Sequence, residues 1–449
     1  MVPPKDVKRE ITKINKGGKA VGERKRYALV GVGSRARFFY QALASTYSKS
    51  SELVAFCDVN QGRMDYANRI LAAACDSSPV ATYLAWDFDR MITETKPDVV
   101  IVTSIDRTHH KYIIRAMDLG CDVITEKPMT TDEKKCEAIF EAIHRTGRNL
   151  RVTFNYRYAP YNTKVRELIM DGVIGDVNSI HFEWLLDTQH GADYFRRWHR
   201  DKRNSGGLLV HKSTHHFDLV NFWLGARPQT VFAMGDLMFY GRENAENRGL
   251  RRFYYRGTGS EAAKDDPFAL DLREKPLLEQ MYLQMEKYDG YLRDQSVFGD
   301  GISIEDTMGV MVRYDSKAVL TYSLNAYMPW EGYRAALNGT KGRIQVDICE
   351  RSYISGGALV SAEGAVQAKT ITVFPVFGEP YKVPLEQAEG SHGGGDPIML
   401  DDLFGMGGAD RFQRAASHLD GAFSILVGIA ANKSMQTGQA IHVDELIKL

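Results

Sequence analysis

Short apolar runs alternate with longer segments of helical periodicity over the first 150 residues. In the longer segments, such as 61–74 and 109–119, apolar residues recur at the spacing of an amphipathic helix. Strands that alternate with helices form parallel sheets with right-handed crossovers. The pattern therefore predicts a doubly wound α/β domain over residues 25–150, with strands at 27–32, 53–58, 98–103 and 122–125.

The remainder of the chain, residues 151–449, has a different pattern. Apolar and polar residues alternate there in many short segments, which is typical of a sheet with one covered face. Helical spacing returns at 161–171, 209–225 and 418–436. We expect a second α/β domain with a large, mainly antiparallel sheet, whose strands are 151–160, 177–187, 229–240, 307–314, 318–326, 333–338 and 342–348.

Two segments interrupt this organisation. Residues 1–24 are basic and polar and lack the apolar core of a secretory signal, so we expect a flexible arm or one that packs on a partner subunit. Residues 241–300 form a polar, charged insertion in the second domain. The insertion is either a cover over an active site or a plain surface excursion, and the sequence leaves both interpretations open.

Composition narrows the class of protein. The 57 basic and 57 acidic side chains balance, which argues against a nucleic-acid or anionic-membrane surface. No apolar run is long enough to span a bilayer. The 5 cysteines are scattered without a paired motif, as expected for reduced thiols in a cytoplasmic protein.

A glycine motif joins the first strand to the first helix. Gly31-x-Gly33-x-x-Ala36 has the small residues that a tight turn, a close approach to a pyrophosphate and helix–strand packing require. The amide groups at Ser34 and Arg35 would face the phosphates at the helix N-terminus. This motif predicts a Rossmann dinucleotide-binding domain.

Asp58 ends the second strand, where an acid accepts the hydroxyls of the adenine ribose. This position favours NAD as the cofactor and makes NADP less suitable. Arg35 and Arg63 keep NADP open, because a nearby arginine can hold a 2′-phosphate.

Two further segments follow strand ends. The loop 103–109 should border the nicotinamide half of the cofactor through Thr103 and His109, although His109 could equally be a residue that simply starts a helix. Glu126-Lys127-Pro128 closes the strand at 122–125, and the proline favours an extended backbone at Lys127. The lysine is thus aimed at the sheet edge where such folds bind ligands.

In this order and spacing, these segments resemble the Gfo/Idh/MocA oxidoreductase family of NAD(P)-dependent sugar and inositol dehydrogenases. The resemblance implies that Glu126 and Lys127 border the cofactor and that Lys127 and His215 are catalytic. It also implies that Asn155 and Arg157 lie beside the substrate, and that the large sheet makes subunit contacts in a homo-oligomer, a dimer or a tetramer.

The segment 190–201 mixes aromatic rings with arginines and is expected to be a loop. Arg197, Trp198 and His199 suit a hydroxylated and possibly anionic ligand, because sugars stack on rings and guanidinium groups bind carboxylates. A solvated basic loop is the alternative. Tyr291, at the end of the insertion, is a further candidate for substrate binding.

The segment 209–225 predicts one continuous helix that ends at a glycine. His211, His215 and Asp218 would then share one face. His211 stands where many family members have aspartate, which places a second histidine beside the expected catalytic one. Histidines at this spacing can bind a metal, but we expect proton transfer and no metal, because the nicotinamide supplies the redox chemistry.

The sequence thus predicts an NAD-dependent oxidoreductase that acts on a hydroxyl group of a sugar or glycoside. The alternative is a redox-neutral, NAD-dependent glycoside hydrolase or lyase, for which His211 and Tyr291 supply extra base candidates. A protein that only senses NAD is disfavoured, because Lys127 and His215 are both present.

Overall fold

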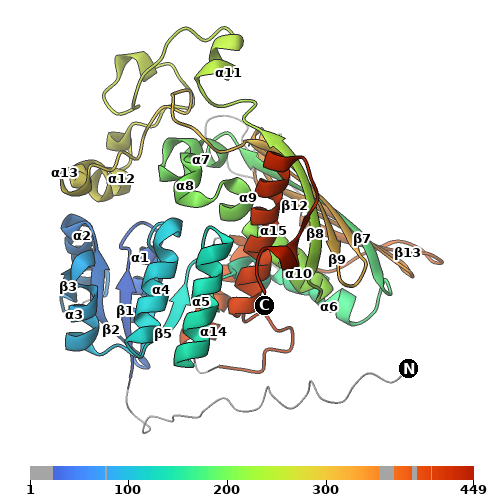
Figure 1. Cartoon of the computed structure of the whole chain (residues 1–449), viewed down its shortest axis with the longest axis horizontal. Coiled ribbons are helices and arrows are strands. Elements are labelled where there is room, and N and C mark those ends of the chain that lie inside the picture. Colours follow the sequence, from blue (N-terminus) through green and yellow to red (C-terminus); the bar gives the residue numbers. More distant parts are fainter. Residues whose placement is uncertain (1–23, 76–77, 353–368, 387–391, 406, 449) are drawn as a thin grey trace.

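The computed structural model describes residues 24–75, 78–352, 369–386, 392–405 and 407–448. The expected N-terminal arm lies outside these residues except for Arg24. Figure 1 shows two sheets, each with its own helices. The first has six parallel strands in the order β3-β2-β1-β4-β5-β6. They are β1 (Lys25–Val30), β2 (Ser51–Asp58), β3 (Ala81–Leu84), β4 (Val99–Val102), β5 (Asp122–Thr125) and β6 (Leu150–Val152).

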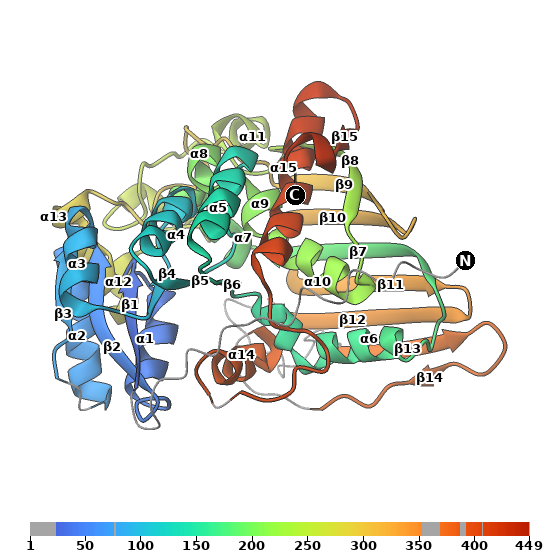
Figure 2. The same cartoon turned by 60° about the horizontal axis from the view of Figure 1, so that its bottom comes forward.

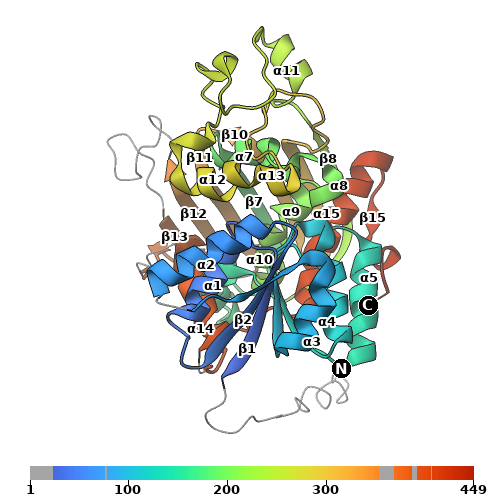
Figure 3. The same ribbon diagram turned by 90° about the vertical axis from the view of Figure 1, so that its left-hand side faces the viewer.

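Helices cover both faces of this sheet (Figure 3). Alternate residues of β1 explain why: Tyr27 and Leu29 pack into one core, and Ala28 and Val30 into another. Both cores need a covering helix layer, so the predicted doubly wound sheet is confirmed. One layer holds α1 (Ala36–Ala44) and α2 (Gln61–Cys75), and the other holds α3 (Phe88–Thr95), α4 (His109–Asp118) and α5 (Glu133–Thr146).

The second sheet has nine strands in the order β14-β13-β12-β11-β7-β10-β9-β8-β15. Only the pair β7–β10 is parallel among its described neighbours, so the predicted mainly antiparallel sheet is confirmed. The strands are β7 (Val177–Asp187), β8 (Pro228–Asp236), β9 (Thr307–Tyr314), β10 (Val319–Met328), β11 (Trp330–Gly339), β12 (Gly342–Ser352), β13 (Lys369–Pro375), β14 (Tyr381–Lys382) and β15 (Ile441–His442).

Three helices lie against one face of this sheet, α6 (Pro160–Met170), α10 (Thr214–Leu224) and α15 (His418–Thr437), as Figure 2 shows. β9 alternates buried and exposed residues accordingly. None of the described helices has both the length and the apolar character needed to cross a membrane.

Two predicted segments have a different structure. Residues 151–160 do not continue as a strand, because β6 ends at Val152 and a 3-10 turn, Asn155–Tyr158, leads into α6. The expected loop at 190–201 is largely helical, with α7 at His190–Arg196 and a 3-10 turn at Trp198–Arg200. Asp187 starts α7, because its carboxylate accepts the amides of residues 189 and 190.

The helix expected at 209–225 is interrupted. α9 (Leu208–His211) and α10 are separated at residues 212 and 213, where the Ser213 amide donates to the carbonyl of Leu208, five residues back. The neighbouring Leu209 carbonyl packs closely on α15, since a Cβ at Gly428 would lie 2.3 Å from its oxygen. Tight packing on α15 accompanies the break, and His211 and His215 are therefore not one regular helical turn apart.

The insertion forms short helices at one end of the molecule. α11 (Arg242–Asn247) lies farthest out, whereas α12 (Pro276–Met281) and α13 (Glu286–Asp289) lie over α2 of the first domain (Figures 1 and 3). We call residues 276–291 the cover.

Candidate active site

A cavity of about 850 Å³ lies where the two domains meet. It opens at the carboxyl ends of β1, β2, β4 and β5, the edge at which doubly wound sheets bind ligands. With the exception of Arg157, every predicted site residue lines it: Gly31, Gly33, Ser34, Arg35, Asp58, Thr103, His109, Glu126, Lys127, Asn155, Arg197, Trp198, His199, His211, His215 and Tyr291.

The glycine loop has the shape that a dinucleotide needs. Gly31 has a φ of +88°, and a Cβ there would lie 2.4 Å from the backbone nitrogen of Ser104. A side chain is therefore excluded at Gly31 by both conformation and space. A Cβ at Gly33 would meet nothing closer than the Tyr282 hydroxyl at 3.8 Å, so the loop is open toward the cavity.

Asp58 is fixed at the end of the cavity beside the carboxyl end of β2, which we call the β2 end. Its Oδ2 accepts the amide of Val32 at 2.5 Å, and its Oδ1 accepts the amide of Asn60 at 2.8 Å. Burial raises the pKa of Asp58, while Arg63 and the two amides act in the opposite direction. Arg63 itself lies between carboxylates, 3.9 Å from Asp58 and 2.8 Å from Asp289 of the cover.

Arg35 lies where the first helix meets the strand end at residue 126. Its Nε donates to Glu126 at 2.6 Å, and its Nη1 lies 3.7 Å from Asp396. Asp396 belongs to α14 (Gly395–Phe404) and also accepts from Asn155 Nδ2 at 2.7 Å. Asp396 was not predicted as a site residue, because no local pattern connects it with Asn155, 241 positions earlier.

His109 supports the loop that borders the cavity. Its Nδ1 faces the carbonyl of Pro128 at 2.8 Å, and its Nε2 faces the carbonyl of Ser104 at 2.9 Å. Burial lowers the pKa of His109, and a neutral ring has one N–H, so one of the two contacts is a hydrogen bond. The Thr103 hydroxyl donates to the Gly31 carbonyl at 2.5 Å and holds the same loop from its other end.

Lys127 reaches from the first domain to the second. Its Nζ donates to the backbone carbonyl of His211 at 3.2 Å, and the Lys127–Pro128 peptide is cis. Burial lowers the pKa of Lys127 to about 8, although Asp106 and Glu126 favour its charged form. Near neutral pH the side chain therefore exchanges readily between ammonium and amine.

Asp106 and His211 form a buried pair across the domain boundary. Asp106 Oδ2 lies 2.5 Å from His211 Nδ1. Burial raises the pKa of Asp106 and lowers that of His211, and Lys127 and Arg197 also lower the pKa of His211. When Asp106 is ionised, the ring donates its Nδ1–H to Oδ2 and Nε2 is its acceptor atom; when Asp106 is protonated, the carboxyl donates to Nδ1 and Nε2 carries the ring proton. The sequence placed Asp106 in the right loop but gave no sign of its partner.

His215 lies in the first turn of α10, with its ring edge-on to Tyr156 at 4.8 Å between centroids. Asp218 does not share its exposure to the cavity, which corrects the expected common face. Its carboxylate instead binds the Arg157 guanidinium at 2.7 and 2.5 Å. Arg157 also donates to Asp420 at 2.9 Å and connects α10 with α15. The expectation that Arg157 contacts substrate is corrected accordingly.

Aromatic and imidazole rings surround His211. Trp198 stacks on His199 with centroids 3.6 Å apart, and His199 lies 4.3 Å from His211. The Tyr194 hydroxyl forms a hydrogen bond with His190 Nε2 at 2.9 Å, and His190 Nδ1 lies 2.6 Å from Glu331 Oε1. Tyr194 and His190 also line the cavity and were not among the predicted site residues.

The cover lies over the β2 end of the cavity, where Tyr282, Asp289 and Tyr291 line it together with Asp58. The Ser34 amide donates to the Tyr282 hydroxyl at 3.2 Å, and Asn60 Nδ2 donates to the carbonyl of Met285 at 3.0 Å. The Arg63–Asp289 ion pair is a third polar contact, and Tyr66 of α2 packs on Met281 and Tyr282 of the cover. Of the two interpretations of the insertion, the structure favours the active-site cover.

Two protein-family models together match most of the chain. The Gfo/Idh/MocA description "Oxidoreductase family, NAD-binding Rossmann fold" matches residues 25–154, and "Oxidoreductase family, C-terminal alpha/beta domain" matches residues 166–443. The Bacillus subtilis protein YteT, whose oxidoreductase name is provisional, is 37% identical over 446 residues, covering 95% of this chain and 99% of YteT.

A second relative is the scyllo-inositol 2-dehydrogenase (NAD(+)) of Bacillus subtilis, 22% identical over 429 residues, covering 93% of this chain and 96% of the relative. Among solved structures, an oxidoreductase from Agrobacterium radiobacter in complex with NAD+, L-tartaric acid and magnesium has a TM-score of 0.62 at 14% identity. The match covers 95% of this chain and 100% of that one, and it shows a shared fold.

Proposed function

Since the chain belongs to the Gfo/Idh/MocA oxidoreductase family, we propose that it is an NAD-dependent enzyme that oxidises or reduces a hydroxyl group of a sugar or glycoside. One observation carries the proposal. Lys127 and His215 line the same cavity as the glycine loop, so that groups able to move a proton lie within one enclosure with a dinucleotide site.

The cofactor, when bound, supplies hydride transfer to or from the substrate carbon. In the oxidation direction, His215 takes the proton of the substrate hydroxyl. The Lys127 ammonium donates a hydrogen bond to the same oxygen and stabilises its developing negative charge. This role requires the charged form of Lys127, which predominates below its pKa of about 8.

NAD is the proposed cofactor, and NADP is less suitable. Asp58 is held by two backbone amides at the end of β2, and a carboxylate there accepts ribose hydroxyls and repels a 2′-phosphate. Arg63 forms an ion pair with Asp289 at 2.8 Å, so it would bind a 2′-phosphate less strongly than an unpaired arginine would. Arg35 is similarly engaged by Glu126.

A second function, redox-neutral glycoside hydrolysis or elimination, is favoured by the Asp106–His211 pair. Transient oxidation of a hydroxyl acidifies the neighbouring C–H bond, after which the anomeric substituent leaves, water adds and the ketone is reduced again. That sequence needs a proton-handling group beyond the one at the reacting hydroxyl. His211, with Nδ1 held by Asp106, supplies one in the same cavity.

The test is a panel of glycosides monitored for both NADH absorbance and released aglycone. Net NADH supports the dehydrogenase, and aglycone without net NADH supports the redox-neutral enzyme. Lys127→Ala should lower turnover by orders of magnitude in either case and change NAD binding far less. Near-normal turnover of Lys127→Ala, or no turnover of any glycoside by the wild type, would refute the proposal.

Single-turnover experiments separate the two histidines. His215→Ala should lose hydride transfer, measured as enzyme-bound NADH. His211→Ala should retain part of it but lose aglycone release if the reaction is redox-neutral. Parallel loss of both signals in both variants would make His211 an accessory of His215 and favour the plain dehydrogenase.

We also propose that the protein is a cytoplasmic homo-oligomer, a dimer or a tetramer. The face of the nine-stranded sheet opposite α10 and α15 has polar side chains in a shallow depression, among them His181, Thr321 and Arg334, and could receive a second copy. Sedimentation equilibrium measures the oligomeric state, and a monomer at micromolar concentration would contradict the proposed homo-oligomer.

A further inference from the structure

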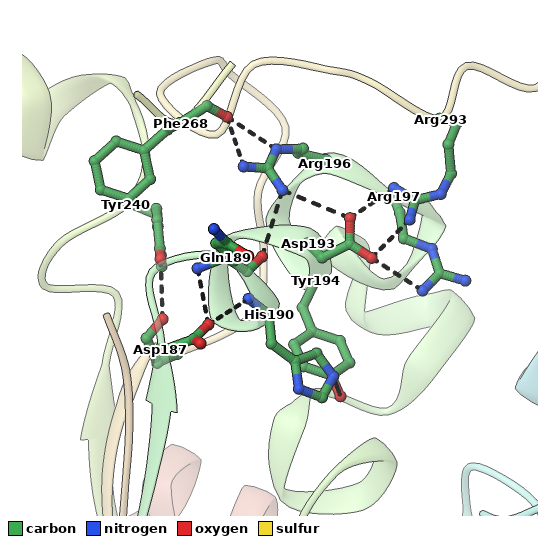
Figure 4. A network of polar contacts seen from close by, with 11 residues as sticks. Asp187, Gln189, His190, Asp193, Tyr194, Arg196, Arg197, Tyr240, Phe268 and Arg293 are labelled. Atoms are coloured by element: carbon green, nitrogen blue, oxygen red, sulfur yellow. Dashed lines mark hydrogen bonds and ion pairs between the residues drawn. The ribbon is translucent and has the colours of Figure 1, made fainter. Parts of the chain in front are cut away.

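Three arginines share one carboxylate beside the cavity (Figure 4). Arg293 binds both oxygens of Asp193, at 2.7 and 2.8 Å. Arg197 Nη1 lies 3.3 Å from the same carboxylate, and Arg196 Nη1 lies 3.6 Å from it. We call these four residues the arginine cluster. Its positive charges outnumber its negative charge.

The three guanidinium groups differ in their other partners. Arg196 donates to the carbonyl of Phe268 at 2.9 and 2.6 Å and is thereby held by backbone. Arg293 directs two donors at Asp193. Arg197 has the longer contact to Asp193 and a second one to the Tyr291 side chain. Its Nε, like that of Arg293, has no hydrogen-bond partner among the described residues, and Arg197 alone of the three lines the cavity.

The excess positive charge acts on the surrounding groups. Burial by itself would raise the pKa of Asp193, but Arg293, Arg197 and Arg196 outweigh it and lower that pKa, so the carboxylate stays ionised. Burial would likewise raise the pKa of Tyr282, yet Arg197 and Arg293, with the Ser34 amide, lower it. Burial would lower the pKa of Arg197, but Asp193, Tyr291 and Tyr282 outweigh it and raise that pKa, so a charged guanidinium is available at the cavity wall to bind a carboxylate.

We propose that Arg197 binds a carboxylate of the substrate, and that the substrate is therefore an acidic sugar such as a uronic acid or its glycoside. Arg197 precedes Trp198 and His199, whose rings lie beside His211 at the proposed reaction centre. A sugar that packs on these rings places its own substituents next to the guanidinium, which binds a planar carboxylate with two donors. This inference rests on the proposed function.

The pyrophosphate of the cofactor is the other anion that could reach this cation. Tyr282, whose pKa Arg197 and Arg293 lower, accepts a hydrogen bond from the backbone amide of Ser34 in the glycine loop. The two sources differ in what the loss of Arg197 changes. If Arg197 binds a substrate carboxylate, replacing it lowers activity selectively on acidic substrates. If it binds the pyrophosphate, replacing it weakens NAD binding and lowers activity on every substrate equally.

The experiment compares matched substrates that differ only in the acid, methyl glucuronide with methyl glucoside and methyl galacturonide with methyl galactoside. For the wild-type enzyme loaded with NAD, kcat/KM should be at least about 10-fold higher for the acid of the preferred pair. Arg197→Gln should remove most of this preference, which is measured as the ratio of kcat/KM for the acid to kcat/KM for the neutral sugar. Arg197→Lys keeps the positive charge but lacks the planar guanidinium that donates two parallel hydrogen bonds, so it should retain part of the preference for the acid.

Arg203→Gln is the matched control, because Arg203 follows shortly after this segment, pairs with Asp201 and has a side chain that is 89% exposed. It should leave the preference for the acid unchanged. Thermal unfolding checks that each variant folds, and calorimetry of the acid against NAD-loaded wild type tests the inference without any variant.

Three results would overturn the inference: equal kcat/KM for acid and neutral sugar, preference for the corresponding sugar phosphate, or weaker NAD binding by Arg197→Gln with an unchanged substrate ratio. These results differ from failure of the proposed function, in which no sugar of either kind yields NADH or aglycone.

Discussion

Replacing Asp106 by asparagine removes one buried negative charge and keeps the shape of the side chain. The amide oxygen can still accept the His211 Nδ1–H, so the ring keeps its orientation. What changes is the electrostatic support of Lys127, for which Asp106 is the strongest of the groups that favour the charged form. The variant therefore isolates the effect of charge from that of geometry.

The size of the effect follows from the pKa of Lys127. A nearby opposite charge moves a pKa by roughly 1–3 pH units, so removing Asp106 should lower the pKa of Lys127 from about 8 to roughly 5–7. At pH 7.5 roughly three-quarters of the wild-type side chains carry a proton, and roughly a quarter or fewer do so in the variant. If the ammonium is the active form, kcat/KM at this pH falls about threefold or more.

The assay is kcat/KM measured from pH 5.5 to 9.5. The wild-type value should fall as pH rises through about 8, because Lys127 loses its proton there, and the midpoint should move down in Asp106→Asn. Asp118→Asn, at an exposed residue that pairs with Arg145, is the control and should not move it. An unchanged midpoint in Asp106→Asn would refute the view that an ionised Asp106 supports Lys127.

Three further predictions concern other parts of the molecule. NAD should bind more tightly than NADP in calorimetry, and Asp58→Ser should narrow the difference; tighter NADP binding by the wild type would contradict the role given to Asp58. Arg157→Met should lower the free energy of unfolding by about 3–5 kcal/mol, because it leaves Asp218 buried without its counter-ion, and unchanged urea unfolding would count against this. Asp289→Asn should speed NAD release several-fold in stopped-flow displacement, because it breaks the ion pair to Arg63; an unaltered rate would show that this pair does not hold the cover.

Local patterns predicted the first domain well. The strands β1, β2, β4 and β5 were predicted from residues close together in the sequence, and the turn at Gly31 requires glycine for reasons of backbone conformation alone. The short strand β3 was not predicted, and β6 was assigned to the second domain as part of 151–160. The positions of Asp58 and Lys127 at strand ends then follow from the parallel sheet, whose carboxyl ends meet at one edge.

Long-range contacts account for what the sequence did not predict. The break between α9 and α10 accompanies close packing on Gly428, more than 200 residues away. The role of Asp106 depends on His211, 105 positions later, and that of Tyr282 on Ser34, 248 positions earlier. No periodicity or spacing within one segment contains such information. Helix α7 was missed for a different reason, since its start depends on a carboxylate at Asp187 and its stability on burial of Phe195.

The cover has a consequence for how a dinucleotide would be used. Its contacts to Ser34, Asn60 and Arg63 hold it over the β2 end of the cavity, and we expect a dinucleotide bound there to leave only when these contacts open. Residence time is then set by the opening of the cover, independently of the chemistry. When residence exceeds the turnover time, a nicotinamide dinucleotide is a prosthetic group and not a cosubstrate. Each hydride that it accepts must be given back on the same protein molecule, either to the first product or to a second molecule that enters the same cavity.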